Sequence, residues 1–550
     1  MHLKYTLLGL WAALVFTLGT GCEKSESGTA VALTPTPLSP DTILRVHWLG
    51  KNELGNRADA FYLMRVWDLP PSAQLELQTL TRLSSAPGRL VRGETGVTNQ
   101  TGAWLYPLLA DVVWNESCLE IRQPANQSAE LVLAIRMDAP RALRWETNLA
   151  AVVESLTGAR TVPAPDGAFG WSLQMPNPPG HIELSRVGEW ILIGAGSDHN
   201  GLLDDVVARI RRDLTPCVSR VPGDWLEADA DLQRLASWLP QGWNPPANLP
   251  RISIAITGDG ANVLTHGQFT FPGPLPLETA PWTPPAGLIQ DPLDSFTAVR
   301  GLQPWLSSLK IWHELPLSSP PGQVYFWSVP GAPSQAYFSA LLPDASNQVD
   351  HLTTYLMEQS NPWLDARGYV KFQRLPDGNG VSWGNLPSIQ PFLKSVDAAG
   401  GGMVFGGLLP DTNPGTNTQD NLYPRPAPSR LFDQLSTQTN LVYYDWELTG
   451  SRIQPCLYLG QVARVISRHP QLPEETVSVG WLQAIQPRLG PSTTTITCTG
   501  PNQLSLSRIS TVGFTGAELQ LLADWLESPQ FPFGLYSLTP PPSQSVTRDE

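Results

Sequence analysis

The chain has 550 residues, enough to bury one large core or two to three ordinary ones. It carries 35 basic and 49 acidic side chains, a net charge of −14, and its longest basic run is Arg211-Arg212. Nucleic-acid binding and electrostatic docking on anionic lipid both need clustered positive charge, so the sequence argues against both. The 54 prolines and 46 glycines favour many short elements joined by turns.

The N-terminus has the layout of an export signal. Lys4 precedes an apolar run from Leu7 to Leu18, small residues follow, and Cys22 stands after them. The run is short for a membrane span, which favours a signal peptide over residues 1–21. These residues resemble the start of bacterial lipoproteins, except that Gly19 replaces the leucine usual three places before the cysteine. The resemblance implies that Cys22 is lipidated; ordinary secretion and an uncleaved anchor are the alternatives.

Two polar segments frame the body of the chain. Residues 22–42 are rich in Ser, Thr and Pro without an apolar period, which predicts a flexible tether after the lipidated cysteine. Residues 537–550 are expected to be a disordered tail for the same reason. Between them we expect two α+β halves, 43–285 and 286–536.

The first half shows strand and helix signals in alternation. Residues 129–137 predict a strand, and Asp138 with Pro140 predicts the start of a helix that ends at Gly158. A hairpin is expected to turn at residues 187–188. The helix after it has an apolar face made by Leu203, Val206, Val207 and Ile210.

The second half repeats this order. Residues 336–342 predict a strand, Asp344 a helix start, the DGNG sequence at 377–380 a hairpin turn, and residues 387–396 a short helix. A third copy begins with a strand at 440–448 and continues to a hairpin, 494–498 and 504–509. The final helix carries the clearest local signals, which are the Thr515–Glu518 capping box, the Phe514–Leu519 staple and the Ser528-Pro529 stop.

These copies predict an α+β fold of two tandem halves, built from degenerate strand–helix–hairpin–helix modules, with antiparallel sheets and helices on one face. The order of elements, together with the Cys22 segment, resembles envelope lipoproteins built from repeated α+β modules. The resemblance covers most of the body loosely, and it implies no activity and no functional residues.

Two glycine motifs are weak candidates for catalysis or nucleotide binding. Residues 380–384 match GxSxG, but the preceding hairpin turn predicts that Ser382 lies inside a strand and not on a nucleophile elbow. Gly194 and Gly196 fit two positions of a dinucleotide fingerprint, but His199 occupies the third. Ordinary helix caps by Ser197, Asp198 or Asn200 explain this segment better.

Metal and carboxylate sites find equally little support. No two histidines are spaced as a chelate, and Trp312-His313-Glu314 lacks the second histidine of HExxH. Residues 411–417 alternate oxygen ligands but lack the glycine and glutamate of a calcium loop, so a polar Pro-rich loop at 410–429 is expected. The acidic run 227–231 predicts a solvated strand or helix start. No cofactor and no metal are therefore expected.

Cysteines and tryptophans leave alternatives open. Cys118, Cys217, Cys456 and Cys498 allow two disulfides in three pairings in an exported chain, or four buried thiols. Exposed tryptophans would suit stacking on sugars. Helical spacing with leucines instead predicts core packing for Trp145, Trp238, Trp305 and Trp525.

The sequence predicts a lipid-anchored cell-envelope protein, with Glu23 favouring the outer membrane and the body facing the periplasm or exterior. The motifs show no catalytic set, so we expect binding or scaffolding of an envelope protein or glycan. An envelope hydrolase or carbohydrate-processing protein, with a site unrecognisable in sequence, is the alternative. The membrane, through the lipid, is the expected partner, and no ligand-binding residues are predicted.

Overall fold

The architecture is that of a computed structural model. It describes residues 39–536 with internal gaps. The gaps are 94–98, 125–126, 177–178, 197–199, 218–222, 237–247, 278–279, 290–291, 302, 309–311, 313–316, 318, 331–335, 367, 385–388, 399–400, 409–424, 454–474 and 533. The predictions for the signal peptide, Cys22, most of the tether, Trp238, the 411–417 loop, Cys456 and the tail therefore lie outside the described residues.

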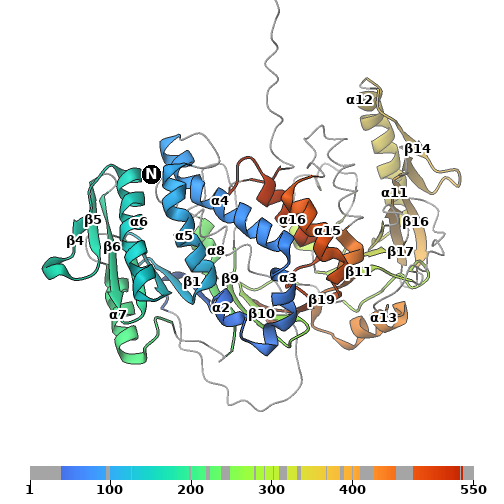
Figure 1. Ribbon diagram of the computed structural model, residues 1–550. Helices are drawn as coiled ribbons and strands as arrows, with labels where there is room; N and C mark the ends of the chain where they lie inside the picture. The colour runs from blue at the N-terminus through green and yellow to red at the C-terminus, as the bar shows by residue number, and fades with distance from the viewer. Residues whose placement is uncertain are drawn as a thin grey trace, which may run out of the picture.

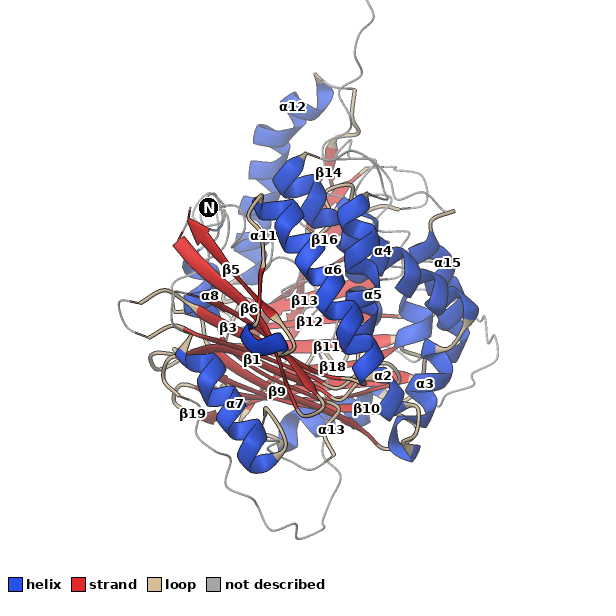
Figure 2. Cartoon of the chain, turned by 60° about the vertical axis from the view of Figure 1, so that its left-hand side comes forward, coloured by secondary structure: helices blue, strands red, loops and turns tan. Residues whose placement is uncertain are grey.

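One antiparallel sheet of 20 strands runs through the described part of the molecule (Figures 1 and 2). From one edge its order is β4 (Val162–Pro163), β5 (Trp171–Pro176), β6 (Pro179–Val187), β7 (Trp190–Gly196), β3 (Glu130–Arg136), β2 (Ser117–Arg122), β1 (Thr42–Trp48), β8 (Leu226–Asp231), β9 (Arg251–Gly258) and β10 (Val263–Thr270). It continues through β20 (Gln503–Ser510), β19 (Pro491–Gly500), β18 (Leu441–Leu448), β11 (Ser295–Arg300), β12 (Gln323–Ser328), β13 (Ala336–Leu341), β17 (Gly401–Gly407), β16 (Phe392–Ala398), β15 (Gly380–Trp383) and β14 (Phe372–Arg374). The α+β class is thus as predicted.

Most helices form a layer over one face of this sheet (Figure 1). From the first part of the chain these are α2 (Lys51–Leu54), η1 (Ala58–Ala60), α3 (Phe61–Trp67), α4 (Pro70–Arg92), α5 (Gln100–Trp114) and α6 (Ala139–Thr157). From the second part they are α11 (Ala345–Tyr355), α15 (Val477–Ile485), η4 (Gln486–Arg488) and α16 (Gly516–Glu527). Smaller helical segments are η2 (Pro165–Gly167), α8 (Leu232–Ala236), α9 (Gln303–Ser308), η3 (Leu356–Ser360) and α12 (Asn361–Asp365).

Two helices lie on the opposite face, so the expectation of helices on one face only is wrong. Helix α7 (Gly201–Asp213) packs on Val132 and Leu192, whereas Leu133 and Ile191 belong to the core that includes Trp145 of α6. Successive strand residues point to opposite faces, so α6 and α7 cover different sides. Helix α13 (Pro428–Thr437) covers its own apolar cluster through Leu431 and Leu435. Strands that are apolar on both faces require cover on both.

Local sequence signals account for several element boundaries. Asp138 caps α6 by accepting a hydrogen bond from the Arg141 amide at 2.9 Å, and Gly158 ends the helix in the left-handed region. Helix α16 has the predicted capping box, in which Thr515 and Glu518 bond each other's backbone amides. Asp344 stands at the start of α11 but makes no capping bond, because its own φ is 50°.

The predicted hairpins are confirmed and one predicted helix is not. Strands β6 and β7 pair up to the turn at residues 188–189, β14 and β15 flank the 377–380 turn, and β19 pairs with β20. Where a helix was expected at 387–396, the described residues from Phe392 form β16 instead. Pairing with β17 on one side and β15 on the other overrides the weak helical pattern there.

Candidate functional site

The GxSxG serine is an ordinary strand residue, as predicted. Ser382 lies within β15, is 4 % exposed, and pairs in register with Gln373 and Phe392 on the two neighbouring strands. A nucleophile elbow needs a sharp turn from strand to helix at the serine. This position in the sheet does not provide one.

The glycine motif of residues 191–201 also has a structural explanation. Gly194 and Gly196 belong to β7, whose partners β3 and β6 are both antiparallel to it. A dinucleotide fold requires a parallel βαβ unit at this point. Asn200 caps α7 by accepting the Leu203 amide at 3.0 Å, as expected of a helix cap, while His199 lies outside the described residues.

The acidic run 227–231 is not solvated, which corrects the sequence-based expectation. Glu227 and Asp229 are 5 % and 4 % exposed in β8, where they lie opposite His47 and Arg45 of β1. Asp229 forms an ion pair with Arg45 at 3.2 Å. Basic partners on the neighbouring strand offset the desolvation cost of burying these acids. His47 in turn bonds Glu116 at 3.0 Å. Burial is the largest single influence and lowers the pKa of His47, but the bond to Glu116 and the nearby charges of Cys217, Glu116 and Glu227 together outweigh it, so the pKa is raised.

A second buried acid pair lies on β18. Asp445 and Glu447 are 6 % and 3 % exposed, and Glu447 accepts the Gly516 amide at the start of α16 at 2.7 Å. Arg508 bonds Glu518 through two contacts of 2.7 and 2.8 Å beside them. Because these acids bond to a helix start and to strand hydroxyls, their arrangement is structural. Burial and neighbouring Asp445 raise the pKa of Glu447 to about 7.

We predict that Glu447→Gln changes how stability depends on pH. The native carboxyl stays protonated up to about pH 7, while in the unfolded chain it ionises near its ordinary value of 4.5. Its favourable contribution to the free energy of unfolding is therefore complete below pH 4.5. This contribution is lost progressively as the pH rises from 4.5 through about 7. The free energy of unfolding can be measured in urea at pH 5 and at pH 8. Over this range the parent should lose about 2 kcal/mol more than the variant. Glu358→Gln, at an exposed position, is the control; parallel profiles for parent and Glu447→Gln would contradict the prediction.

Two cysteines meet in the core beneath α7. Cys118 of β2 and Cys217 after α7 are 3 % and 4 % exposed, belong to one apolar cluster and are hydrogen-bonded to each other. Burial raises the pKa of Cys118, and the bond to Cys118 lowers that of Cys217. Both are free thiols in this structure, as is Cys498.

We predict that oxidation joins Cys118 to Cys217. With oxidised glutathione as the oxidant, non-reducing digestion should give one linked peptide containing both residues. A bridge across 99 positions should add about 2–4 kcal/mol to the free energy of unfolding, and a reductant should remove it. Cys118→Ser should abolish the reductant effect, whereas Cys498→Ser should not. Recovery of two separately alkylated peptides after oxidation would rule out the bridge.

One cavity lies between the helical layer and the middle of the sheet. Its volume is about 280 Å³. Its walls come from α3, α4, α5, α15 and α16 on one side and from β1, β8, β9 and β10 on the other. The lining is almost wholly apolar, with Leu63, Val66, Leu75, Leu80, Leu83, Val112, Leu226, Ile256, Val263, Phe514, Leu519, Leu522 and Leu526 among its residues. We refer to it as the central cavity.

Five tryptophans line the central cavity, and protein acceptors bond all five indole N–H groups. Trp67 donates to Glu76 at 2.8 Å and Trp481 to Ser72 at 3.2 Å. The others, Trp48, Trp225 and Trp525, donate to the Val113 carbonyl, Asp59 and the Pro532 carbonyl. The indoles therefore present mainly carbon to the cavity, and an occupant needs no polar group to satisfy them. Core packing of Trp145 is confirmed at 3 % exposure, and the Trp305 side chain is outside the described part.

A polar pocket adjoins the central cavity on the outer side of α3. Its volume is about 520 Å³, and Arg57, Arg65, Asp68 and Arg488 are among its lining residues, with Tyr62, Met64, Val66 and Leu69. The Tyr62 hydroxyl donates to the Arg488 carbonyl at 2.9 Å, which fixes η4 against α3. We refer to it as the arginine pocket.

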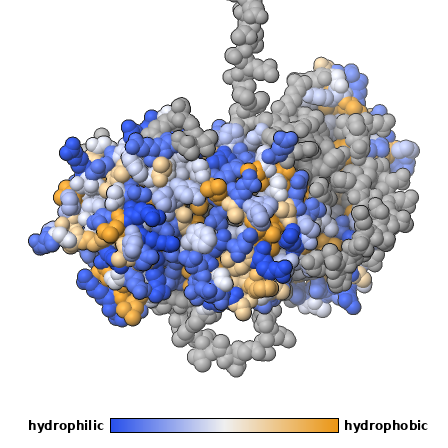
Figure 3. Space-filling model, viewed as in Figure 1, coloured by the Kyte–Doolittle hydropathy of each residue, from blue (hydrophilic) through white to orange (hydrophobic). Residues whose placement is uncertain are grey.

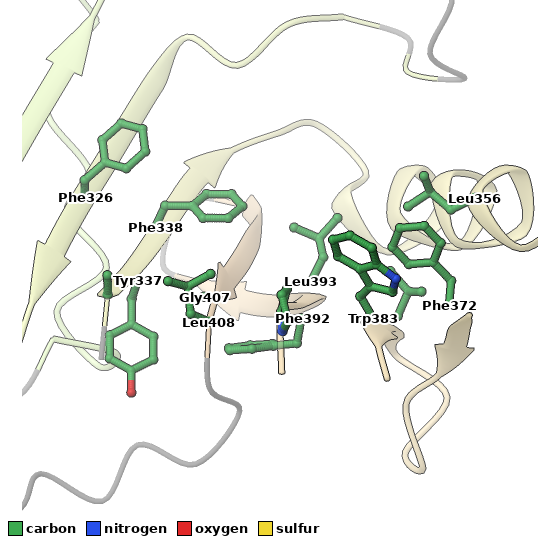
Figure 4. Close-up of a pocket in the computed structure, with 13 residues that line it drawn as sticks. Phe326, Tyr337, Phe338, Leu356, Phe372, Trp383, Phe392, Leu393, Gly407 and Leu408 are labelled. Atoms are coloured by element: carbon green, nitrogen blue, oxygen red, sulfur yellow. The ribbon is translucent and has the colours of Figure 1, made fainter. Parts of the chain in front are cut away.

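A third hollow, of about 390 Å³, lies at the far end of the sheet (Figure 4). Phe326 and Phe338 pair across β12 and β13, and Phe372 stacks on Trp383 with centroids 5.6 Å apart. Its lining carries no charged side chain. Elsewhere on the face in Figure 3, apolar residues form small patches between polar ones.

The described part of the chain shows neither a metal cluster nor a membrane-spanning helix. Within these residues, no cluster of three His, Cys, Asp or Glu side chains could hold a metal ion. No described helix is long and apolar enough to cross a bilayer.

Comparison with known proteins does not assign a family. No protein-family model and no curated protein matches the chain. Two crystal forms of a protein called TP0453 align at 7 % and 8 % identity, covering 42 % of this chain and 76 % of theirs. Their TM-scores are 0.23 and 0.22, too low to carry an argument about fold or function.

Proposed function

We propose that this protein is a lipid-anchored, non-catalytic binding protein of the cell envelope, and that the central cavity holds an apolar ligand. The observation that carries the binding proposal is the size of the cavity in an apolar core. The cavity offers about 280 Å³ behind an almost wholly apolar lining. Apolar surface of a ligand that enters it would be removed from water, which is favourable for binding.

The lining indicates what the occupant would be. Water finds few hydrogen-bond partners against such a lining, so the cavity favours apolar molecules. A water-sized group occupies roughly 30 Å³, so the central cavity has room for about nine such groups, such as methylene units. A ligand with a single hydrocarbon chain of about ten carbons fits this volume.

The strand pairings support the two tandem halves in this proposal. Within the described residues, a series of strand pairings in the first half recurs in the second. In the first half the series is β1–β2, β2–β3, β3–β7, β7–β6, β1–β8, β8–β9 and β9–β10. In the second half, in the same order, it is β11–β12, β12–β13, β13–β17, β17–β16, β11–β18, β18–β19 and β19–β20. Helix α6 follows β3 as α11 follows β13, with Asp138 and Asp344 at the two starts. The repeated unit would end at α7 in the first half and at α13 in the second. The second copy would then extend beyond residue 396, where the short helix expected at 387–396 would have closed it. The central cavity would then lie where the halves meet.

The location in the envelope rests on Cys22 and the signal-like segment before it. A lipid on this cysteine and the tether 22–42 would hold the body near the membrane. Glu23 favours the outer membrane. This setting would supply an apolar-ligand carrier with hydrocarbon chains.

We predict that filling part of the central cavity weakens binding of a neutral apolar ligand. Leu522 of α16 lines the cavity, and Leu522→Trp would fill part of it. Decanol binding, followed by tryptophan fluorescence, should weaken at least tenfold, while the thermal midpoint of the free protein should not fall. Leu521→Trp on the same helix is the matched control, because Leu521 is 57 % exposed. Failure of decanol to bind the parent protein would overturn the binding proposal.

We predict that Cys22→Ser prevents lipid attachment without unfolding the body, because the tether separates the two. Metabolic labelling with radioactive palmitate should mark the parent and not the variant, and Cys498→Ser should label normally. Equal labelling of parent and Cys22→Ser would remove the lipoprotein part of the proposal.

A further inference from the structure

The arginine pocket carries positive charge that its own acids do not neutralise. Arg57 is bound to Asp59 at 2.6 Å, and Asp68 lies 3.5 Å from Lys51. Among the residues that the structure describes, neither Arg65 nor Arg488 forms an ion pair. Arg65 lies over the Phe61 ring at 5.7 Å, and Arg488 donates to the Ala484 carbonyl at 2.7 Å. Two guanidinium groups thus face one pocket in a chain whose net charge is −14.

The arginine pocket and the central cavity share one lining residue. Val66 of α3 is 5 % exposed and lines both spaces. Leu63 and Trp67 line the central cavity, while Tyr62 and Arg65 line the arginine pocket. Helix α3 therefore borders both spaces, which meet at Val66.

We propose that the ligand is an anionic amphiphile, with its hydrocarbon chain in the central cavity and its head group bound by Arg65 and Arg488. This inference rests on the binding function proposed above and adds the class of ligand. Guanidinium groups bind carboxylates and phosphates through charge-assisted, often bidentate hydrogen bonds. A pocket with two uncompensated arginines attracts an anion locally even though the sequence has no basic run longer than Arg211-Arg212.

The test compares three ligands that share a ten-carbon chain, at pH 8. Decanoate and decyl phosphate carry the two head groups that arginine recognises, and decanol carries none. Both anions, or one of them, should bind the parent at least tenfold more tightly than decanol, with an affinity that falls as salt is added. The stronger of the two anions identifies the head group as carboxylate or phosphate.

The double variant Arg65→Gln/Arg488→Gln should remove this advantage. Anion binding should fall to the level of decanol, and decanol binding should not change, since the central cavity is intact. Arg211→Gln/Arg430→Gln removes the same charge from two exposed positions elsewhere and should preserve the preference. Circular dichroism of both double variants would verify folding.

The outcomes separate the two proposals. If decanol binds but neither anion binds more tightly, the anionic head group is wrong and the apolar site stands. If the anions are preferred equally by the Arg65/Arg488 variant, the arginine pocket is not the head-group site. If no ligand binds the parent, the proposed function itself fails.

Discussion

The pairing of β10 with β20 is the interaction on which the rest of the architecture depends. Eight residue pairs, from Val263 opposite Ser510 to Thr270 opposite Gln503, join strands that lie more than 230 positions apart in the chain. Every strand up to β10 lies on one side of this junction, and every strand from β11 onward lies on the other. Helix α3 crosses above it to pack with α15 and α16 in one apolar cluster. The central cavity forms only because sheet and helices meet at this junction.

Local signals in the sequence predict local structure well. The capping box of α16, the Asp138 cap of α6 and the 377–380 turn are each encoded within a few residues, and the structure has all three. Segments without such signals depend on their neighbours. Residues 392–398 become a strand because β15 and β17 flank them, and no pattern inside the segment specifies that pairing.

The candidate site shows the same limit more strongly. The central cavity draws on residues from Trp48 to Leu526, and their apolar character is indistinguishable in sequence from ordinary core packing. Leucines at helical spacing correctly indicated that Trp145 is buried, but they did not indicate where space would remain between helices. Arg65 and Arg488 lie 423 positions apart, so their shared pocket could not be recognised without the fold. The burial of Glu227 and Asp229 likewise depends on partners from a strand far upstream.

The described sheet of 20 strands has two free edges, and the strand at each edge is very short. Strand β4 has two residues, one of them Pro163, and β14 has three, including the charged Arg374. Proline lacks an amide donor, and so short a ladder offers little backbone for another chain to extend. So wide an antiparallel sheet would otherwise be a template for edge-to-edge polymerisation. These two short edge strands leave a neighbouring molecule little backbone with which to pair.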